Sequence, residues 1–111
     1  MAETIGQNPR KVLIVEDSKH WQKLLPRLFD RKGVETVVVA SAEAAKEALK
    51  EGGFSEIVTD GLEGDWKIVA DNAGGLPVKL LSLGVTHKSA AEEQGIRFFD
   101  KNDFDPEDLV E

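Results

Sequence analysis

The sequence predicts a single α/β domain built on a parallel β-sheet, and three features indicate this fold. Short apolar runs alternate with longer amphipathic runs along the 111 residues, as strands and helices do in βαβ units. The apolar runs are continuous, which is typical of strands covered on both faces. Glycines that can close a helix stand shortly before each later strand, at Gly33, Gly52, Gly53, Gly74, Gly75 and Gly95. This order favours right-handed crossovers and one parallel sheet.

Five strands are expected from the apolar and β-branched runs. In the first of them, KVLIV, four apolar residues run directly into Glu16 and Asp17. The second is rich in valine, and the third, EIVTD, ends in an aspartate. The expected ranges are Lys11–Val15, Val34–Ala40, Glu56–Asp60, Pro77–Leu83 and Ile96–Asp100.

Five helices are expected to alternate with these strands. The first follows Ser18, placed as an N-cap, and has an apolar face that begins at Trp21. The second follows Ser41 as its cap and turns alanine and leucine inward. The third falls within residues 63–75 and the fourth within residues 86–95. The last begins at Asp105 and has about seven residues before Glu111.

Composition excludes several classes of function. The formal net charge is −7, which repels nucleic acid and anionic membranes. Cysteine is absent, which excludes disulfides and thiolate sites. No apolar run approaches the ~20 residues of a membrane span, and MAETIGQNPR lacks the apolar core of a signal peptide, so we expect a cytoplasmic protein. Residues 1–10 are expected to form a flexible polar arm, followed by one domain over residues 11–111.

Polar side chains follow several of the expected strands. They are Glu16 and Asp17 after the first strand, Asp60 at the end of the third, Ser82 near the end of the fourth, and Lys101 after the fifth. The carboxyl ends of parallel strands meet at one edge of a sheet. If the first and third strands are neighbours, three carboxylates converge there, and they either raise one another's pKa or require a cation. Oxygen ligands suit Mg²⁺, and a carboxylate, a metal, a lysine and a hydroxyl together are typical of a phosphoryl-transfer site.

Four segments at strand ends, VEDS, IVTD, LLS and FFDK, occur in this order. They reproduce the acidic pair, phosphoacceptor aspartate, serine or threonine, and lysine of the receiver domains of bacterial response regulators, which the chain resembles from about Lys11 to its end. The resemblance implies a doubly wound, flavodoxin-like (CheY-like) sheet of order 2-1-3-4-5 with helices on both faces. Compared with that family, the third and fifth helices expected here are short.

The resemblance also implies a role for each site residue. Asp60 is the phosphoacceptor, and Glu16, Asp17 and Asp60 hold Mg²⁺ together with the backbone carbonyl of Leu62. Three further residues act on the phosphoryl group or respond to it. Ser82 rotates inward to bond it, Lys101 pairs with it, and the rotamer of Phe98 follows the movement of the serine.

By the same resemblance, the chain is a phosphoacceptor of two-component signalling. A sensor histidine kinase or a histidine phosphotransfer protein phosphorylates Asp60, and the altered surface binds a downstream protein effector. Such a domain is not an enzyme in the ordinary sense, because it catalyses only its own phosphotransfer and dephosphorylation.

Two other functions stay open. The loop DGLEGDW lacks the proline of the family, Leu83 stands where a small residue is usual, and Asn102 replaces the proline after Lys101. These departures favour a pseudo-receiver, an interaction module that works without phosphorylation. A small α/β nucleotide-binding or hydrolase-like enzyme is the third candidate, although the acidic pair after the first strand repels an unaided phosphate.

Two expectations concern the surface. His20 and His87 lie in polar helical surroundings, and we expect both in solvent without a role. Because the last helix is short, we expect part of the sheet face beneath the first and fifth helices to be apolar and exposed. Such a face favours a homodimer or a helical partner.

Overall fold

The central element of the protein is a five-stranded, all-parallel β-sheet with the order β2-β1-β3-β4-β5. A computed structural model describes residues 10–111. The strands are β1 (Lys11–Val15), β2 (Glu35–Val39), β3 (Glu56–Thr59), β4 (Val78–Ser82) and β5 (Arg97–Asp100). The number, order and direction of the strands confirm the fold predicted from the sequence.

Within the described residues, four α-helices and one 3-10 turn connect the strands, and a fifth α-helix follows β5. They are α1 (Lys19–Asp30), α2 (Ala42–Glu51), η1 (Leu62–Gly64), α3 (Trp66–Asp71), α4 (Lys88–Glu93) and α5 (Pro106–Val110). Helices α3 and α5 have six and five residues, so both are as short as predicted. Ser41 caps α2 by accepting a hydrogen bond from the Ala44 N–H. Ser18 occupies the N-cap of α1, as predicted, although its side chain makes no cap hydrogen bond.

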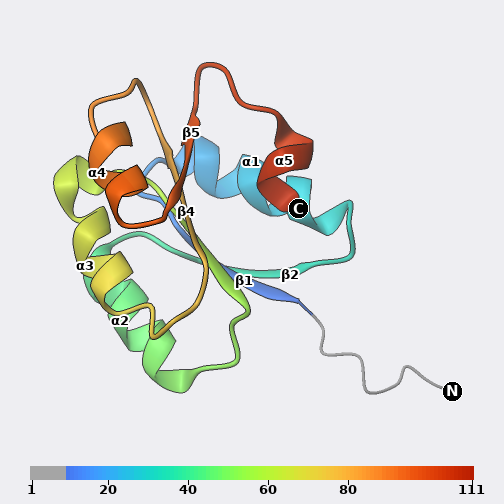
Figure 1. The fold of residues 1–111 in the computed structure, drawn as a ribbon. Coiled ribbons are helices and arrows are strands. Elements are labelled where there is room, and N and C mark those ends of the chain that lie inside the picture. The colour runs from blue at the N-terminus through green and yellow to red at the C-terminus, as the bar shows by residue number, and fades with distance from the viewer. Residues whose placement is uncertain (1–9) are drawn as a thin grey trace, which may run out of the picture.

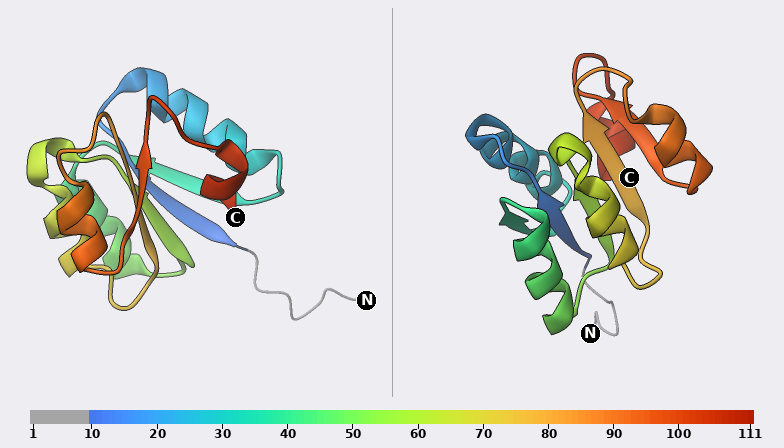
Figure 2. Two further views of the ribbon diagram at one scale, coloured as in Figure 1. Left: turned by 45° about the horizontal axis from the view of Figure 1, so that its top comes forward. Right: turned by 90° about the vertical axis from the view of Figure 1, so that its left-hand side faces the viewer.

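Helices cover both faces of the sheet, with α1 and α5 on one side and α2, α3 and α4 on the other (Figures 1 and 2). The alternation of side chains along a strand decides which layer each residue enters. In β1, Val12 and Ile14 pack in the cluster that contains α1 and α5, whereas Leu13 and Val15 pack against α2 and α3. All four side chains are fully buried, which explains why β1 is a continuous apolar run.

The sheet face beneath α5 is buried, contrary to the prediction of an exposed apolar face there. Leu109 and Val110 are 0% and 4% exposed, because even a five-residue helix places two apolar side chains in the cluster around Leu25 and Phe29. Within residues 10–111, the exposed large apolar side chains are Leu83 and Val85, which lie in the loop between β4 and α4. A homodimer stays a prediction without support from an apolar face at α5.

A cluster of buried charges ties α5 to the amino-terminal ends of the strands. Glu56 bonds Arg10, and its other carboxylate oxygen lies 3.2 Å from Lys79 Nζ. Each cation also donates to a carbonyl at the end of α5, Arg10 to Val110 and Lys79 to Leu109, at 2.8 and 2.7 Å. Arg10 therefore belongs to the folded domain, whereas residues 1–9 of the predicted arm lie outside the described residues.

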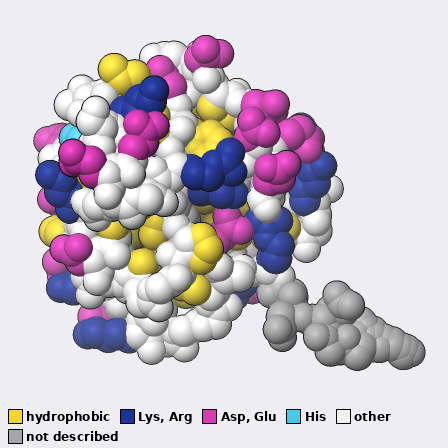
Figure 3. All heavy atoms as spheres, in the orientation of Figure 1, with side chains coloured by type: hydrophobic (Ala, Val, Ile, Leu, Met, Phe, Trp, Pro, Cys, Tyr) yellow, Lys and Arg dark blue, Asp and Glu magenta, His cyan; other side chains and the backbone are white. Residues whose placement is uncertain are grey.

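The surface carries its excess negative charge unevenly. Acidic side chains gather over α5 and the loop before it, where Asp103, Asp105, Glu107 and Asp108 are exposed (Figure 3). A surface of this kind repels polyanions. No helix within residues 10–111 combines the length and the apolar character that crossing a bilayer requires.

The buried cluster gives a prediction about stability. Lys79→Met removes the donor to the Leu109 carbonyl and one of the two cations beside Glu56. Loss of a buried hydrogen-bond partner costs about 1–3 kcal/mol, so the free energy of unfolding should fall by that amount. Urea denaturation measures it. Lys50→Met is the control, because Lys50 pairs with Glu47 in solvent, where an ion pair contributes about 0–1 kcal/mol. Equal losses in the two variants would contradict the buried role.

Candidate functional site

The carboxyl ends of four strands bring the predicted polar residues to one edge of the sheet. Backbone bonds that extend the ladders one residue past the strands fix their positions. The N–H of Glu16 donates to the Val39 carbonyl at 2.9 Å, and that of Asp60 donates to the Val15 carbonyl at 2.7 Å. The Lys101 N–H donates to the Ser82 carbonyl at 2.9 Å. These bonds set the main chain from which each functional side chain projects.

Three carboxylates converge at this edge, as the sequence predicted for neighbouring first and third strands. Glu16, Asp17 and Asp60 each offer an oxygen, and these oxygens all lie within 4.8 Å of one another. Glu16 is buried, Asp60 is half-buried and Asp17 is exposed, so the group leads from the interior of the protein to solvent.

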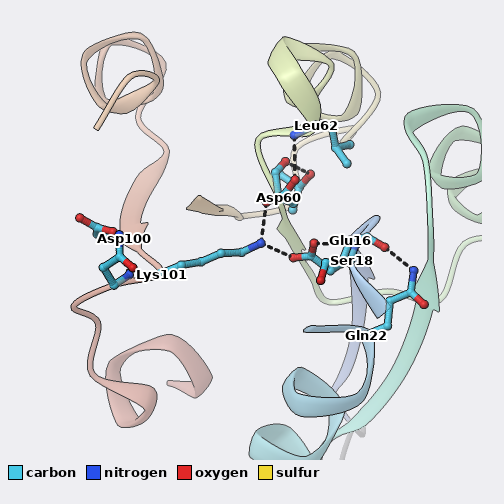
Figure 4. Close-up of polar contacts among 9 residues, drawn as sticks. Glu16, Ser18, Gln22, Asp60, Leu62, Asp100 and Lys101 are labelled. Atoms are coloured by element: carbon cyan, nitrogen blue, oxygen red, sulfur yellow. Dashed lines mark hydrogen bonds and ion pairs between the residues drawn. The ribbon is translucent and has the colours of Figure 1, made fainter. Parts of the chain in front are cut away.

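Lys101 reaches between two of the carboxylates from the end of β5 (Figure 4). Its Nζ lies 2.7 Å from Asp60 Oδ1 and 2.8 Å from Glu16 Oε1. The lysine side chain is only 4% exposed, and its ammonium also lies 4.9 Å from the centre of the Trp21 ring. A buried cation in this position offsets the repulsion between Glu16 and Asp60.

Backbone donors bind the carboxylate oxygens of Asp60 and Glu16 that Lys101 does not contact. Leu62 N–H donates to Asp60 Oδ2 at 2.9 Å, and Ser18 N–H donates to Glu16 Oε2 at 3.1 Å. The Leu62 N–H lies in a tight turn where Leu62 and Glu63 both adopt positive φ, at 49° and 54°. This strained turn after Asp60 fixes the orientation of the carboxylate.

Three residues that support the site were not predicted for it. Gln22 Nε2 donates to the Glu16 carbonyl at 2.7 Å, and the Thr59 hydroxyl donates to the Asp60 carbonyl at 2.8 Å. Trp21 covers the Lys101 ammonium. Trp21 and Gln22 lie in the first turn of α1, which begins a few residues after the end of β1. This closeness in sequence to Glu16 and Asp17 is the one signal that connects them with the site.

Burial makes the ionised form of Glu16 costly. Loss of water around this carboxyl raises its pKa above the ordinary value of 4.5, and the nearby negative charge of Asp60 raises it further. The bonds from Lys101 and from the Ser18 N–H act in the opposite direction without cancelling the effect of burial. The edge of the sheet therefore favours cations that relieve its negative charge.

The donor set fits a hard divalent cation. Three carboxylates face one lysine, so a full set of ionised groups leaves two negative charges in excess. Oxygen ligands with adjacent open space are the environment that Mg²⁺ prefers, since this ion retains several waters. The Leu62 carbonyl accepts a bond from the Asp65 N–H at 3.0 Å within η1, so its role as a metal ligand stays a prediction.

A hollow of about 390 Å³ opens beside Asp17, between the start of α2 and the turn after Asp60. Its wall carries three carboxylates, those of Asp17, Glu63 and Asp65, together with Ser41. An unaided phosphate or nucleotide would meet negative charge there. This finding disfavours the nucleotide-binding alternative.

Within residues 10–111, no hydrogen bond joins Ser82 to any of the three carboxylates, and Phe98 has no polar side-chain atom to offer them. The Ser82 side chain points toward Gly61, since a Cβ built on that glycine would lie 2.7 Å from Ser82 Oγ. Phe98 is half-buried and packs on the cluster around Trp66 and Leu80. Leu83, which follows the serine, is 61% exposed.

The raised pKa of Glu16 gives a prediction about pH. The folded protein binds a proton at Glu16 more readily than the unfolded chain, so the stability due to this group is present below pH 4.5 and is lost as the pH rises through the raised pKa. Glu16→Gln removes that dependence. In EDTA, the free energy of unfolding of wild type should therefore fall relative to this variant as the pH rises from about 4.5 to about 7.

Urea denaturation at a series of pH values measures the difference. Glu92→Gln, a matched change at an exposed glutamate, is the control. A difference between wild type and Glu16→Gln that does not vary with pH, or that varies in the opposite direction, would contradict the burial of an ionisable Glu16.

Comparison with known proteins identifies the architecture. No protein-family model matches the chain, and no curated protein matches it. Solved structures do match. The receiver domain of the Francisella response regulator 1452 is 22% identical, with a TM-score of 0.76 over 91% of this chain and 90% of that one.

Two further structures show the same likeness. A response regulator receiver domain protein from Clostridium thermocellum has a TM-score of 0.77 at 17% identity, covering 91% of this chain and 88% of that one. The chemotaxis protein CheY4 of Vibrio cholerae has a TM-score of 0.73 at 20% identity, covering 92% and 93%. The chain therefore has the fold of response regulator receiver domains, and its acidic group lies at the carboxyl edge of that fold.

Proposed function

We propose that the protein is a phosphoacceptor receiver of a two-component system, and that Asp60 is the residue phosphorylated. One observation carries the proposal: Lys101 Nζ lies between Asp60 Oδ1 and Glu16 Oε1 at 2.7 and 2.8 Å, in a group of three carboxylates. A structural ion pair needs only one carboxylate. Two further anions beside the pair suit a site that takes up a cation and a phosphoryl group.

The reaction is a transfer between a donor and Asp60. A carboxylate oxygen of Asp60 attacks the phosphorus, the bond from phosphorus to the donor atom breaks, and the donor leaves with the electron pair. The product is an acyl phosphate on Asp60. Lys101 is already within bonding distance of this carboxylate, so it needs little movement to meet the new oxygens.

Bound Mg²⁺ would supply charge neutralisation for the incoming phosphoryl oxygens. Glu16, Asp17 and Asp60 are the residues that would hold it. Lys101 bonds Asp60 Oδ1 and the Leu62 N–H donates to Asp60 Oδ2, so the carboxylate keeps one orientation while the phosphoryl donor approaches.

We infer the partners from the same reaction. The donor is the phosphohistidine of a sensor histidine kinase or of a phosphotransfer protein in the cytoplasm, and a downstream protein reads the altered surface. Ser82 and Phe98 are proposed to make that alteration, the serine by turning toward the phosphoryl group and the aromatic ring by following it. Ser82 is buried and Phe98 is half-buried, so the movement of one side chain affects the packing around the other.

A pseudo-receiver is the second candidate. It is favoured by the turn after Asp60, in which the Leu62 carbonyl accepts a hydrogen bond from the Asp65 N–H. This carbonyl is therefore already engaged and less available as a metal ligand. In that case the acidic edge would serve only to bind a partner, and Asp60 would stay unmodified.

Acetyl phosphate distinguishes the two candidates. With Mg²⁺ present, intact mass spectrometry should find one added phosphoryl group per chain in the wild type and none in Asp60→Ala, because the acceptor oxygen is then gone. EDTA should abolish the modification, because the excess negative charge of the site repels an anionic donor.

Asp71→Ala is the matched control, since Asp71 is an exposed carboxylate at the end of α3 and should leave the modification unchanged. An unmodified wild type under conditions that label a known receiver would contradict the proposal and favour the pseudo-receiver. A phosphoryl group that persists in Asp60→Ala would place the acceptor elsewhere.

A further inference from the structure

Gly61, the residue after Asp60, is crowded by neighbouring side chains, although its backbone conformation does not require glycine. Its φ of −65° and ψ of −28° are right-handed helical values that any residue adopts. A Cβ there would nevertheless lie 2.7 Å from Ser82 Oγ and 3.1 Å from His87 Cδ2. At every other glycine within residues 10–111, a Cβ would have nothing within 4 Å. The Ser82 hydroxyl and the His87 ring therefore share the space beside Gly61.

His87 is not the solvated side chain that the sequence suggested. It is half-buried, and its ring centre lies 6.1 Å from that of Trp66 at an interplanar angle of 62°. Trp66 is fully buried and its Nε1 has no hydrogen-bond partner among the described residues. Edge contacts between rings depend on their geometry, so a displacement of His87 changes the surroundings of Trp66.

A short loop connects the two residues that share this space. Ser82 ends β4 and His87 precedes α4, with residues 83–86 between them. Leu83 and Val85 in this loop are 61% and 64% exposed, so their side chains do not anchor it to the core. Trp66 also belongs to the cluster on which Phe98 packs, so its surroundings include both Phe98 and the His87 ring.

We propose that His87 is a positioning residue that couples Ser82 to Trp66, and this inference rests on the phosphoacceptor function proposed above. When the Ser82 hydroxyl turns toward a phosphoryl group on Asp60, it leaves the space beside Gly61. The His87 ring then enters that space, moves away from Trp66 and draws the loop between β4 and α4 with it.

The glycine makes this exchange possible. A side chain at position 61 would occupy the shared space in both states and would force the flexible Ser82 side chain and the His87 ring out of it. Gly61→Ala should therefore displace the His87 ring at rest and keep it from entering this space when the Ser82 hydroxyl leaves.

Trp66 emission tests the coupling in a Trp21→Phe background, where Trp66 is the sole tryptophan of the chain. Beryllofluoride with Mg²⁺ mimics the acyl phosphate, and fluorine NMR records whether it is bound. We expect bound beryllofluoride to shift the Trp66 emission maximum. His87→Ala should lose the shift with beryllofluoride still bound, and His87→Phe, which restores a ring, should recover it.

Two further variants sharpen the test. His20→Ala is the matched control, because the ring of His20 lies 5.7 Å from Trp21 and not beside Trp66, and it should keep the full shift. Gly61→Ala should show a displaced emission maximum at rest and little further change when beryllofluoride is added.

The possible failures are distinguishable. A full shift in His87→Ala with beryllofluoride bound, or a resting emission in Gly61→Ala equal to that of its parent, would overturn the coupling and leave the phosphoacceptor function standing. If neither the wild type nor the Trp21→Phe parent bound beryllofluoride, that result would overturn the proposed function and the coupling with it.

Discussion

The ion pairs of Lys101 are the interaction on which the acidic edge depends. Its ammonium, on a side chain only 4% exposed, lies within 2.8 Å of both Glu16 and Asp60, two carboxylates that would otherwise repel each other. Burial of a charge is costly unless the charge is paired, and pairing here requires β1, β3 and β5 to end at the same edge. The parallel sheet therefore comes first and the site is its consequence. A phosphoryl group on Asp60, as proposed, would offer Lys101 a further anion, so the lysine would exchange partners without losing all of them.

The same physical solution occurs at the opposite edge of the sheet. There Glu56 lies between Arg10 and Lys79, and the two cations also bind the carbonyls that end α5. Ion pairs thus connect distant elements at both edges. The loop after Ser82 differs, because its large apolar side chains, Leu83 and Val85, are exposed. Segments with few buried apolar contacts open at lower free energy than a buried sheet, so we expect local movement in this loop.

The sheet and the acidic edge could be predicted from the sequence, because both follow from local patterns: continuous apolar runs, glycines after helices and polar residues at strand ends. Contacts between residues that the loops bring together could not be predicted in this way. The burial of Leu109 and the place of Lys79 depend on the path of the chain into α5. The half-buried position of His87 depends on Gly61 and Trp66, which lie more than a whole strand away in sequence, and no periodicity indicates it.

A crystal structure with beryllofluoride and Mg²⁺ would show whether Asp60 is the phosphoacceptor. We expect beryllium bonded to a carboxylate oxygen of Asp60, Mg²⁺ bound by Glu16, Asp17 and Asp60, and Lys101 Nζ in contact with fluorine. Beryllofluoride on another carboxylate, or an acidic edge that holds neither ion at saturating concentrations, would contradict this expectation.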